Sequence, residues 1–278
     1  MPELPELEIV CEVLQRRVVG HAITEAELIP PGGGIVARDL THGGFERGLS
    51  GEVIRAVDRR GKFLVFALGV EPRLSFLVIN PKLTGRLQLA GSSEKRLART
   101  HLVLHLDDSR QLRYLDQKRM GQLYLTRDLD AVPEYTGMGP EPLAISLADF
   151  RERLLAFRGE IKGILTRGAL VAGIGNAYAD EILWEARLHP YRKRTQLTSE
   201  EVDRLYHALG PTLTEATAKV RAEMREQIHL EPREFMAVHM KTGRPCPRCG
   251  TTISLVGANQ RITNFCRSCQ PGGLIKGM

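Results

Sequence analysis

The stretch that decides the C-terminal architecture is CPRCGTTISLVGANQRITNFCRSC, residues 246–269. It opens with Cys246-Pro-Arg-Cys249 and closes with Cys266-Arg-Ser-Cys269, sixteen residues further on. Each pair can turn two thiolates toward one point, and two such turns joined by a hairpin make a tetrahedral zinc site. Because protein fills all four positions, we predict a structural zinc ion. Redox dithiols and an iron site are the alternatives that the cysteines leave open.

The composition of the chain indicates a globular protein of the reducing cytoplasm. Its 278 residues are enough for about two domains. The fifth cysteine, Cys11, lies in an apolar helical pattern and is expected to be a buried thiol. The opening MPELPELE has no apolar signal core, and no apolar run is long enough to span a membrane. The net charge of +6 suits a polyanionic partner without identifying one.

The periodicity of apolar residues changes along the chain. It predicts a helix over 5–18 and then short strands in an antiparallel sandwich or barrel, including 52–57, 62–68, 74–79, 101–106 and 111–115. A stretch rich in Pro and Gly at 132–143 marks a domain boundary. Helices are predicted to begin at Ser146, Ala177 and Thr198, the last with a Thr198/Glu201 capping box. The fold class is therefore α+β, with a catalytic β-sandwich domain (1–135), a helical domain (136–235) and a zinc-bearing hairpin (236–278).

The N-terminus carries residues suited to covalent chemistry. Proline at position 2 permits removal of Met1, which exposes a secondary amine with a pKa near 8 (about 7.7–8.0). Such an amine can attack a sugar C1′ and expel a base, leaving an iminium that promotes elimination of the 3′ phosphate. Glu3 could relay protons, and Glu6 could orient the amine. The alternative is that these acidic residues only begin a helix.

Two further cations are candidates of the same kind. Lys62 follows Arg59-Arg60-Gly61 in a predicted hairpin, and Arg261 lies on the ribbon between the cysteine pairs. Either could bind phosphate. Taken alone, each is more often an ordinary solvated side chain.

Together these motifs resemble the formamidopyrimidine-DNA glycosylase and endonuclease VIII family, and the resemblance runs from Pro2 to about Gln270. Residues 2–6 (PELPE) are similar to its N-terminal motif, and 59–62 (RRGK) to its catalytic-lysine hairpin. Residues 138–143 (MGPEPL) are similar to its interdomain linker, and 173–183 (GIGNAYADEIL) to its helix–two-turns–helix element. The cysteines and Arg261 match its zinc finger.

The resemblance implies a base-excision glycosylase and abasic-site lyase that acts as a monomer on damaged double-stranded DNA. Pro2 becomes the Schiff-base nucleophile and Glu3 the general acid/base, with Lys62 and Arg261 assisting elimination at the phosphates. Asn176 is implied to hold phosphate at a helix start, which alone reads as a cap. Arg158 and Lys162 are expected to face DNA, the alternative being a solvated helix face.

Several positions depart from the family pattern. A flipped-out base leaves a hole in the duplex, and the implied fillers are Leu83, Lys118 and Met120 in place of methionine, arginine and phenylalanine. Arg99 replaces a DNA-binding histidine. The stretch 218–236 lacks the glycine-rich loop of the branch that repairs oxidised guanine, and it reads as largely helical. Formamidopyrimidine is therefore the expected lesion, with 8-oxoguanine less favoured. Oxidised pyrimidines, bare abasic sites or a non-catalytic lesion-binding role are the alternatives.

Overall fold

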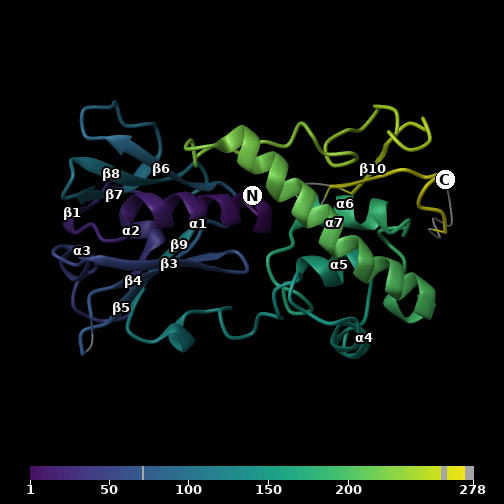
Figure 1. Cartoon of the computed structure of the whole chain (residues 1–278), viewed down its shortest axis with the longest axis horizontal. Coiled ribbons are helices and arrows are strands. Elements are labelled where there is room, and N and C mark those ends of the chain that lie inside the picture. The colour runs from purple at the N-terminus through teal and green to yellow at the C-terminus, as the bar shows by residue number, and fades with distance from the viewer. Residues whose placement is uncertain (71, 258–261, 273–278) are drawn as a thin grey trace. The chain divides into compact units, whose positions relative to one another are not determined.

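The computed structural model describes residues 1–70, 72–257 and 262–272 (Figure 1). The chain divides into two compact units. The first comprises Met1–Gly137 together with Val220–Pro232, and the second comprises Met138–Lys219 together with Arg233–Met278. The first boundary falls two residues from the position predicted for it. The zinc-bearing segment, however, belongs with the helices instead of standing as a third domain, and 220–232 belongs with the N-terminal unit.

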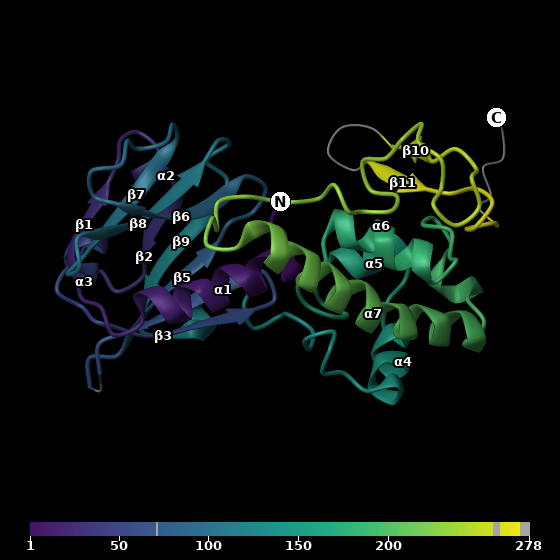
Figure 2. The ribbon, with the colours of Figure 1, turned by 45° about the horizontal axis from the view of Figure 1, so that its top comes forward.

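The first unit begins with α1 (Leu4–Val18), whose bounds match the predicted helix to within a residue. Pro5 suits the first turn of a helix, where its missing N–H costs nothing. Apolar residues at helical spacing, such as Leu7, Val10 and Leu14, are buried. The helix contacts β3 and β4, and Figure 2 shows it alongside β3. Gly20, with φ near +90°, turns the chain toward the first strand.

Two sheets form the body of this unit. One has the order β1-β7-β8-β6, with β1 (Ile23–Leu28), β7 (Thr100–Leu106), β8 (Arg110–Asp116) and β6 (Gly85–Gly91), and it is antiparallel throughout. The other has the order β2-β9-β5-β4-β3, with β2 (Ala37–Asp39), β9 (Gln122–Thr126), β5 (Ser75–Asn80), β4 (Phe63–Leu68) and β3 (Ile54–Arg60). The pair β2–β9 is parallel, which differs from the all-antiparallel expectation. Short helices α2 (Gly33–Val36), α3 (Phe45–Leu49) and η1 (Leu129–Ala131) connect strands or follow them.

The second unit is helical, as predicted. It contains α4 (Leu147–Leu155), α5 (Ile161–Thr166), α6 (Asn176–Glu185), η2 (Arg194–Gln196) and the part of α7 (Ser199–Met224) up to Lys219; the end of α7, from Val220, belongs to the first unit. Ser146 caps α4 by accepting the N–H of Asp149, and Thr198 and Glu201 form the predicted capping box. The expectation of a largely helical 218–236 is wrong beyond Met224, because Arg225 has φ of +50° and the following residues form turns.

The zinc-bearing segment carries a two-stranded antiparallel ribbon. Its strands are β10 (Ser254–Val256) and β11 (Thr263–Phe265). A small core of Val238, Ile253 and two of the cysteines lies beneath it, with Trp184 from α6 packed against that core. The ribbon is thus attached to α6 by apolar contacts as well as by the cysteines.

Candidate active site and zinc centre

Three of the residues predicted to carry the chemistry, Pro2, Glu3 and Glu6, lie at or just before the start of α1. Pro2 is buried, and Glu3 and Glu6 are each 1% exposed. The backbone N–H of Glu3 donates to the Glu6 carboxylate at 2.9 Å, so Glu6 orients the segment that bears Pro2. Both carboxylates lie near the positive end of the helix dipole, which favours negative charge there. The sequence-based alternative, a plain helix start, describes the geometry correctly but does not explain a buried N-terminal segment.

The chain begins with Met1, whose ammonium pairs with the carboxylate of Glu231 at 2.9 Å. Arg86 on β6 forms a second ion pair with the same carboxylate. Pro2 itself lines a mostly apolar cavity with Leu7, Tyr114 and other residues of this unit. While Met1 is attached, the nitrogen of Pro2 is an amide and cannot act as a nucleophile.

Lys62 occupies a two-residue turn between β3 and β4. Arg60 pairs with Phe63 across this turn, and Gly61 supplies a φ of +57°. The guanidinium of Arg59 contacts Glu8 of α1 at 2.5 Å, which ties the hairpin to the helix. The predicted hairpin is therefore confirmed, and Lys62 is half-buried at its tip.

Two loops with predicted DNA contacts are held by one buried carboxylate, that of Asp116. It accepts the hydroxyl of Thr84 from one loop and the N–H groups of Lys118 and Gly121, at 3.1 and 2.7 Å, from the other. The hydroxyl of Tyr114 lies close to both loops, because a Cβ would fall 1.6 Å from it on Gly121 and 2.3 Å from it on Gly85. Sequence reasoning assigned no role to Asp116, and the available signal was a single acidic residue at the end of an apolar strand.

The side chains presented by these loops are accessible. Lys118 and Arg99 are exposed, Met120 is 48% exposed, and Leu83 is half-buried. Arg99 adopts φ of +66°, and its carbonyl accepts the N–H of Asp116 at 2.9 Å. The structure thus gathers these four candidates around Asp116 in the first unit.

Asn176 is the first residue of α6 and not its cap, which is Gly175. Its side-chain amide donates to the carbonyl of Ile262, just before β11, at 2.8 Å. Asn176 therefore links the start of α6 to the zinc-bearing ribbon. Arg158 is exposed in the loop between α4 and α5, and Arg261 lies outside the described residues.

Lys162 departs from its expected place facing DNA. It is 6% exposed, and its ammonium pairs with Asp180 on α6 at 2.6 Å and donates to Thr263 on β11 at 2.8 Å. The second oxygen of Asp180 accepts from His239 at 2.8 Å and from the N–H of Asn264 at 3.1 Å. The expectation is corrected accordingly, because a buried ammonium needs such partners and finds them in the protein.

The neighbouring carboxylate, Glu181, completes the attachment. It accepts the N–H groups of Ala237, Val238 and His239 at 2.8–2.9 Å. Sequence reasoning assigned no role to Asp180 and Glu181. The available signal was two adjacent acidic residues inside a helix that is otherwise largely apolar. Carboxylates are rarely buried unless they are paired, so such residues predict partners elsewhere in the chain.

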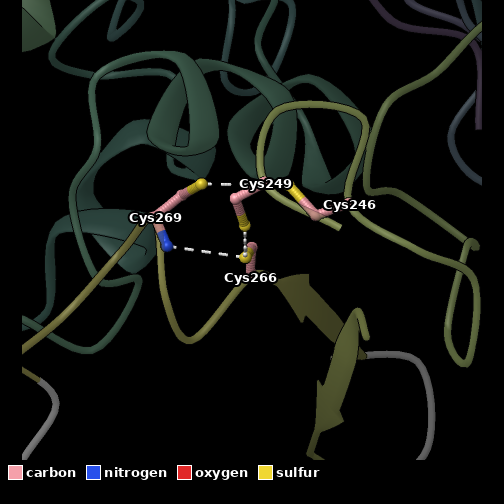
Figure 3. Close-up of side chains that lie close together, drawn as sticks. All are labelled: Cys246, Cys249, Cys266 and Cys269. Carbon is pink, nitrogen blue, oxygen red and sulfur yellow. Dashed lines mark hydrogen bonds between the residues drawn. The ribbon is translucent and has the colours of Figure 1, made fainter. Parts of the chain in front are cut away.

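The four predicted zinc ligands converge, as Figure 3 shows. The sulfur atoms lie within 4.8 Å of one another, with 3.8 Å between Cys246 and Cys269 and 3.5 Å between Cys249 and Cys266. A tetrahedron with zinc–sulfur bonds of about 2.3 Å has edges of about 3.8 Å, so this donor set fits zinc. The pKa of Cys249 is lowered to about 6, chiefly by a hydrogen bond with the Thr251 side chain, which favours the thiolate that a metal needs.

Residues of α6 surround the metal site. The indole N–H of Trp184 donates to the sulfur of Cys246 at 3.4 Å. Arg248, between the first two cysteines, stacks over the Trp184 ring at 3.9 Å and pairs with Glu185. These contacts orient the ligands and indicate a structural role for the ion.

The lone thiol is buried as predicted. Cys11 is 5% exposed, and its sulfur lies 3.4 Å from the carbonyl of Val57. Burial, followed by the nearby charge of Glu8, raises the pKa of Cys11 to about 12. Cys11 therefore belongs to the core of the first unit.

A β-sandwich domain that begins with Pro2, a helical domain and a four-cysteine ribbon follow one another along the chain. This order defines a class of DNA-repair glycosylase with an N-terminal catalytic domain. Three family models match the chain. They are the formamidopyrimidine-DNA glycosylase N-terminal domain (residues 1–123), its H2TH domain (138–227) and the zinc finger found in FPG and IleRS (243–272). The chain belongs to the formamidopyrimidine-DNA glycosylase family.

Individual relatives agree with this assignment. The chain is 38% identical to the formamidopyrimidine-DNA glycosylase of Symbiobacterium thermophilum, over 98% of this chain and 90% of that protein. It is 36% identical to that of Listeria innocua, over 97% of this chain and 100% of that protein. Among solved structures, a Lactococcus lactis FPG mutant in complex with a Fapy-dG-containing DNA matches with a TM-score of 0.85 and 31% identity. That match covers 98% of this chain and 100% of the other.

None of the helices in the described ranges has the length and apolar content needed to cross a membrane.

Proposed function

We propose that this chain removes damaged bases from double-stranded DNA and then cuts the strand at the resulting abasic site. The observation that carries the proposal is the buried Pro2-Glu3 segment, fixed by Glu6, at the head of a domain that matches the family's N-terminal model. Removal of Met1 converts the nitrogen of Pro2 into a secondary amine with a pKa near 8 (about 7.7–8.0), so part of it is neutral at physiological pH.

The chemistry then follows from the amine. Its lone pair attacks C1′ of the sugar, the glycosidic bond breaks, and the base departs with that electron pair and takes up a proton. The amine loses its proton as O4′ gains one and the ring opens, which leaves an iminium between Pro2 and C1′. Loss of the C2′ proton then expels the 3′ phosphate, and a second elimination expels the 5′ phosphate. Glu3 is the proposed carrier of these protons.

Other residues have supporting roles in the proposal. Lys62 at the β3–β4 turn and Arg261 neutralise phosphates during elimination, and Asn176 and Arg158 contact the DNA backbone. Leu83, Lys118 and Met120 fill the space left by the extruded base, and Arg99 binds phosphate beside them. Zinc, held by Cys246, Cys249, Cys266 and Cys269, supplies a rigid ribbon and takes no part in the reaction.

Formamidopyrimidine is the proposed lesion. Lactococcus lactis FPG was solved with abasic-site DNA and, as a mutant, with Fapy-dG-containing DNA. The stretch 225–236 forms turns without glycine, which supports weaker activity on 8-oxoguanine. Oxidised pyrimidines remain the second candidate because Leu83, Lys118 and Met120 differ from the fillers of the guanine-repairing branch. We further propose that the protein is cytoplasmic, because free cysteines suit a reducing compartment, and that it acts as a monomer, as the family resemblance implies.

Borohydride trapping tests the proposal. Protein with Met1 removed and zinc bound is mixed with duplexes that carry formamidopyrimidine, 8-oxoguanine, dihydrouracil or an abasic site. We expect a covalent adduct at residue 2 that is fastest on abasic DNA and, among the bases, on formamidopyrimidine. Pro2→Gly replaces the secondary terminal amine with a primary one. Glu3→Gln removes the carboxylate that is the proposed proton carrier. If processed protein forms no adduct on any duplex, the chain is a lesion-binding protein and not an enzyme.

A further inference from the structure

We propose that Glu231, supported by Arg86, is a positioning residue for the N-terminal amine. The inference rests on the proposed function, in which that amine is the nucleophile. It adds a group that comes from neither α1 nor the β3–β4 turn, but from a segment more than 200 residues further along the chain.

The segment that bears Glu231 is firmly attached to the first unit. Met224 and Ile228 are each 1% exposed and line the cavity that Pro2 also lines. Arg221 pairs with Glu12 of α1 at 2.5 Å, and Glu226 pairs with Arg17 at 3.0 Å. The buried apolar anchors therefore fix the path of 220–232, and the exposed ion pairs lie along it, so Glu231 is held close to the N-terminus.

Glu231 lies at the chain end itself. Its Oε1 is 2.9 Å from the nitrogen of Met1, and its other oxygen pairs with Arg86. The three side chains are only 18–22% exposed, so the contact is partly shielded from water. Consecutive residues are separated by about 3.8 Å between their Cα atoms, so the nitrogen of Pro2 lies within one residue of the nitrogen that Glu231 already holds.

The groups around the amine define what Glu231 can do. Glu3 and Glu6 approach from α1, Arg86 from β6 and Tyr114 from β8, and the rest of the cavity is apolar. Arg86 fixes one oxygen of Glu231, which leaves the other directed at the chain end. Once Met1 is removed, that oxygen accepts a hydrogen bond from the Pro2 amine. The bond fixes the direction of the nitrogen lone pair, and the negative charge stabilises the ammonium form.

A direct titration tests this role without DNA. After Met1 is removed, Pro2 is the only one of the 15 prolines whose nitrogen is not in a peptide bond, so its signal in ¹⁵N-proline-labelled protein reports the amine. We expect Glu231→Gln to lower the pKa of Pro2 by about one pH unit, because a nearby negative charge is lost. Glu226→Gln is the matched control, since it removes a carboxylate from the same segment without altering the amine.

The same variants are then compared on abasic-site DNA. We expect the trapping rate of Glu231→Gln to fall about tenfold at its plateau, with the acidic limb of the pH profile moved to lower pH. Glu231→Asp keeps the charge and should restore the position of that limb, which a purely structural role would not predict. Thermal melting confirms that each variant is folded.

The outcomes separate the two proposals. An unchanged Pro2 titration in folded Glu231→Gln overturns the role of Glu231, whatever the activity of the enzyme. Absence of any adduct in the wild-type protein overturns the proposed function, and with it the nucleophile that Glu231 serves.

Discussion

Besides Asp116, the two units each bury a pair of carboxylates at or next to a helix, and the pairs differ in what they contact. In the second unit, Asp180 and Glu181 are bonded to a lysine, a histidine and four backbone N–H groups, all of them inside the protein. In the first unit, Glu3 and Glu6 lie beside a chain end that changes chemically when Met1 is removed. Burial of a carboxylate therefore does not by itself indicate catalysis, and the partner decides between a structural and a chemical role.

Zinc removal should cause the largest loss of stability, and this loss should be confined to the second unit, which contains the four cysteines. Structural zinc contributes about 10–16 kcal/mol in isolated zinc-finger peptides. We expect chelation to expose the amides of residues 243–257 and 262–272 to hydrogen exchange while those of α1 and the two sheets stay protected. If the amides of the first unit exchanged equally fast, the metal would stabilise more than the segment that contains it.

Asp180→Ala should be the most destabilising single substitution of the four carboxylates. It leaves the ammonium of Lys162 buried without its charge partner, which costs about 3–5 kcal/mol. Urea unfolding of the second unit measures the loss. Asp203→Ala is the control, because its pair with Arg151 is exposed and should contribute at most about 1 kcal/mol. Equal losses for the two variants would remove the distinction between buried and exposed pairs.

Glu6→Gln should have a smaller effect on stability and a larger one on chemistry. The variant keeps an acceptor for the N–H of Glu3 but loses its charge at the helix start, a change of about 1 kcal/mol. We expect the rate of adduct formation at Pro2 to fall by about tenfold or more, since the segment is oriented through this bond. Thermal melting measures the change in stability, and borohydride trapping measures the change in adduct formation. A stability loss as large as that of Asp180→Ala would show that Glu6 also has a mainly structural role.

The smallest expected effect concerns Cys11. Because its pKa is raised to about 12, the thiol stays protonated well above physiological pH, and only the thiolate reacts readily with iodoacetamide. We expect no alkylation of Cys11 at pH 8 in the folded, zinc-bound protein and full alkylation in urea. Mass spectrometry of peptides would reveal any modification of the folded form, which would show that α1 opens locally.

Local signals predicted much of this molecule. The helix at the N-terminus, the Thr198/Glu201 capping box, the hairpin at Lys62 and the four-cysteine site each depend on residues close in sequence, and each is present in the structure. Such features can be predicted because short-range sterics and hydrogen bonding determine them.

Features that depend on distant partners were not predictable in the same way. Lys162 reads as an exposed cation until Asp180 and Thr263 are placed beside it. The stretch after Met224 reads as helix, yet it turns at Arg225, and the segment 220–232 joins the first unit through contacts with residues such as Glu12 and Arg17. The parallel pairing of β2 with β9 likewise joins residues more than 80 positions apart.

The shared carboxylate of Asp116 has a consequence for how the first unit meets a partner. Because Thr84, Lys118 and Gly121 all bond to it, the loop of Leu83 and the loop of Met120 form one rigid surface. The conformational entropy of both loops is lost when the protein folds, so it need not be lost again on association. A partner that accommodates one of these side chains meets the other already in place, and binding of the two is coupled through preorganisation.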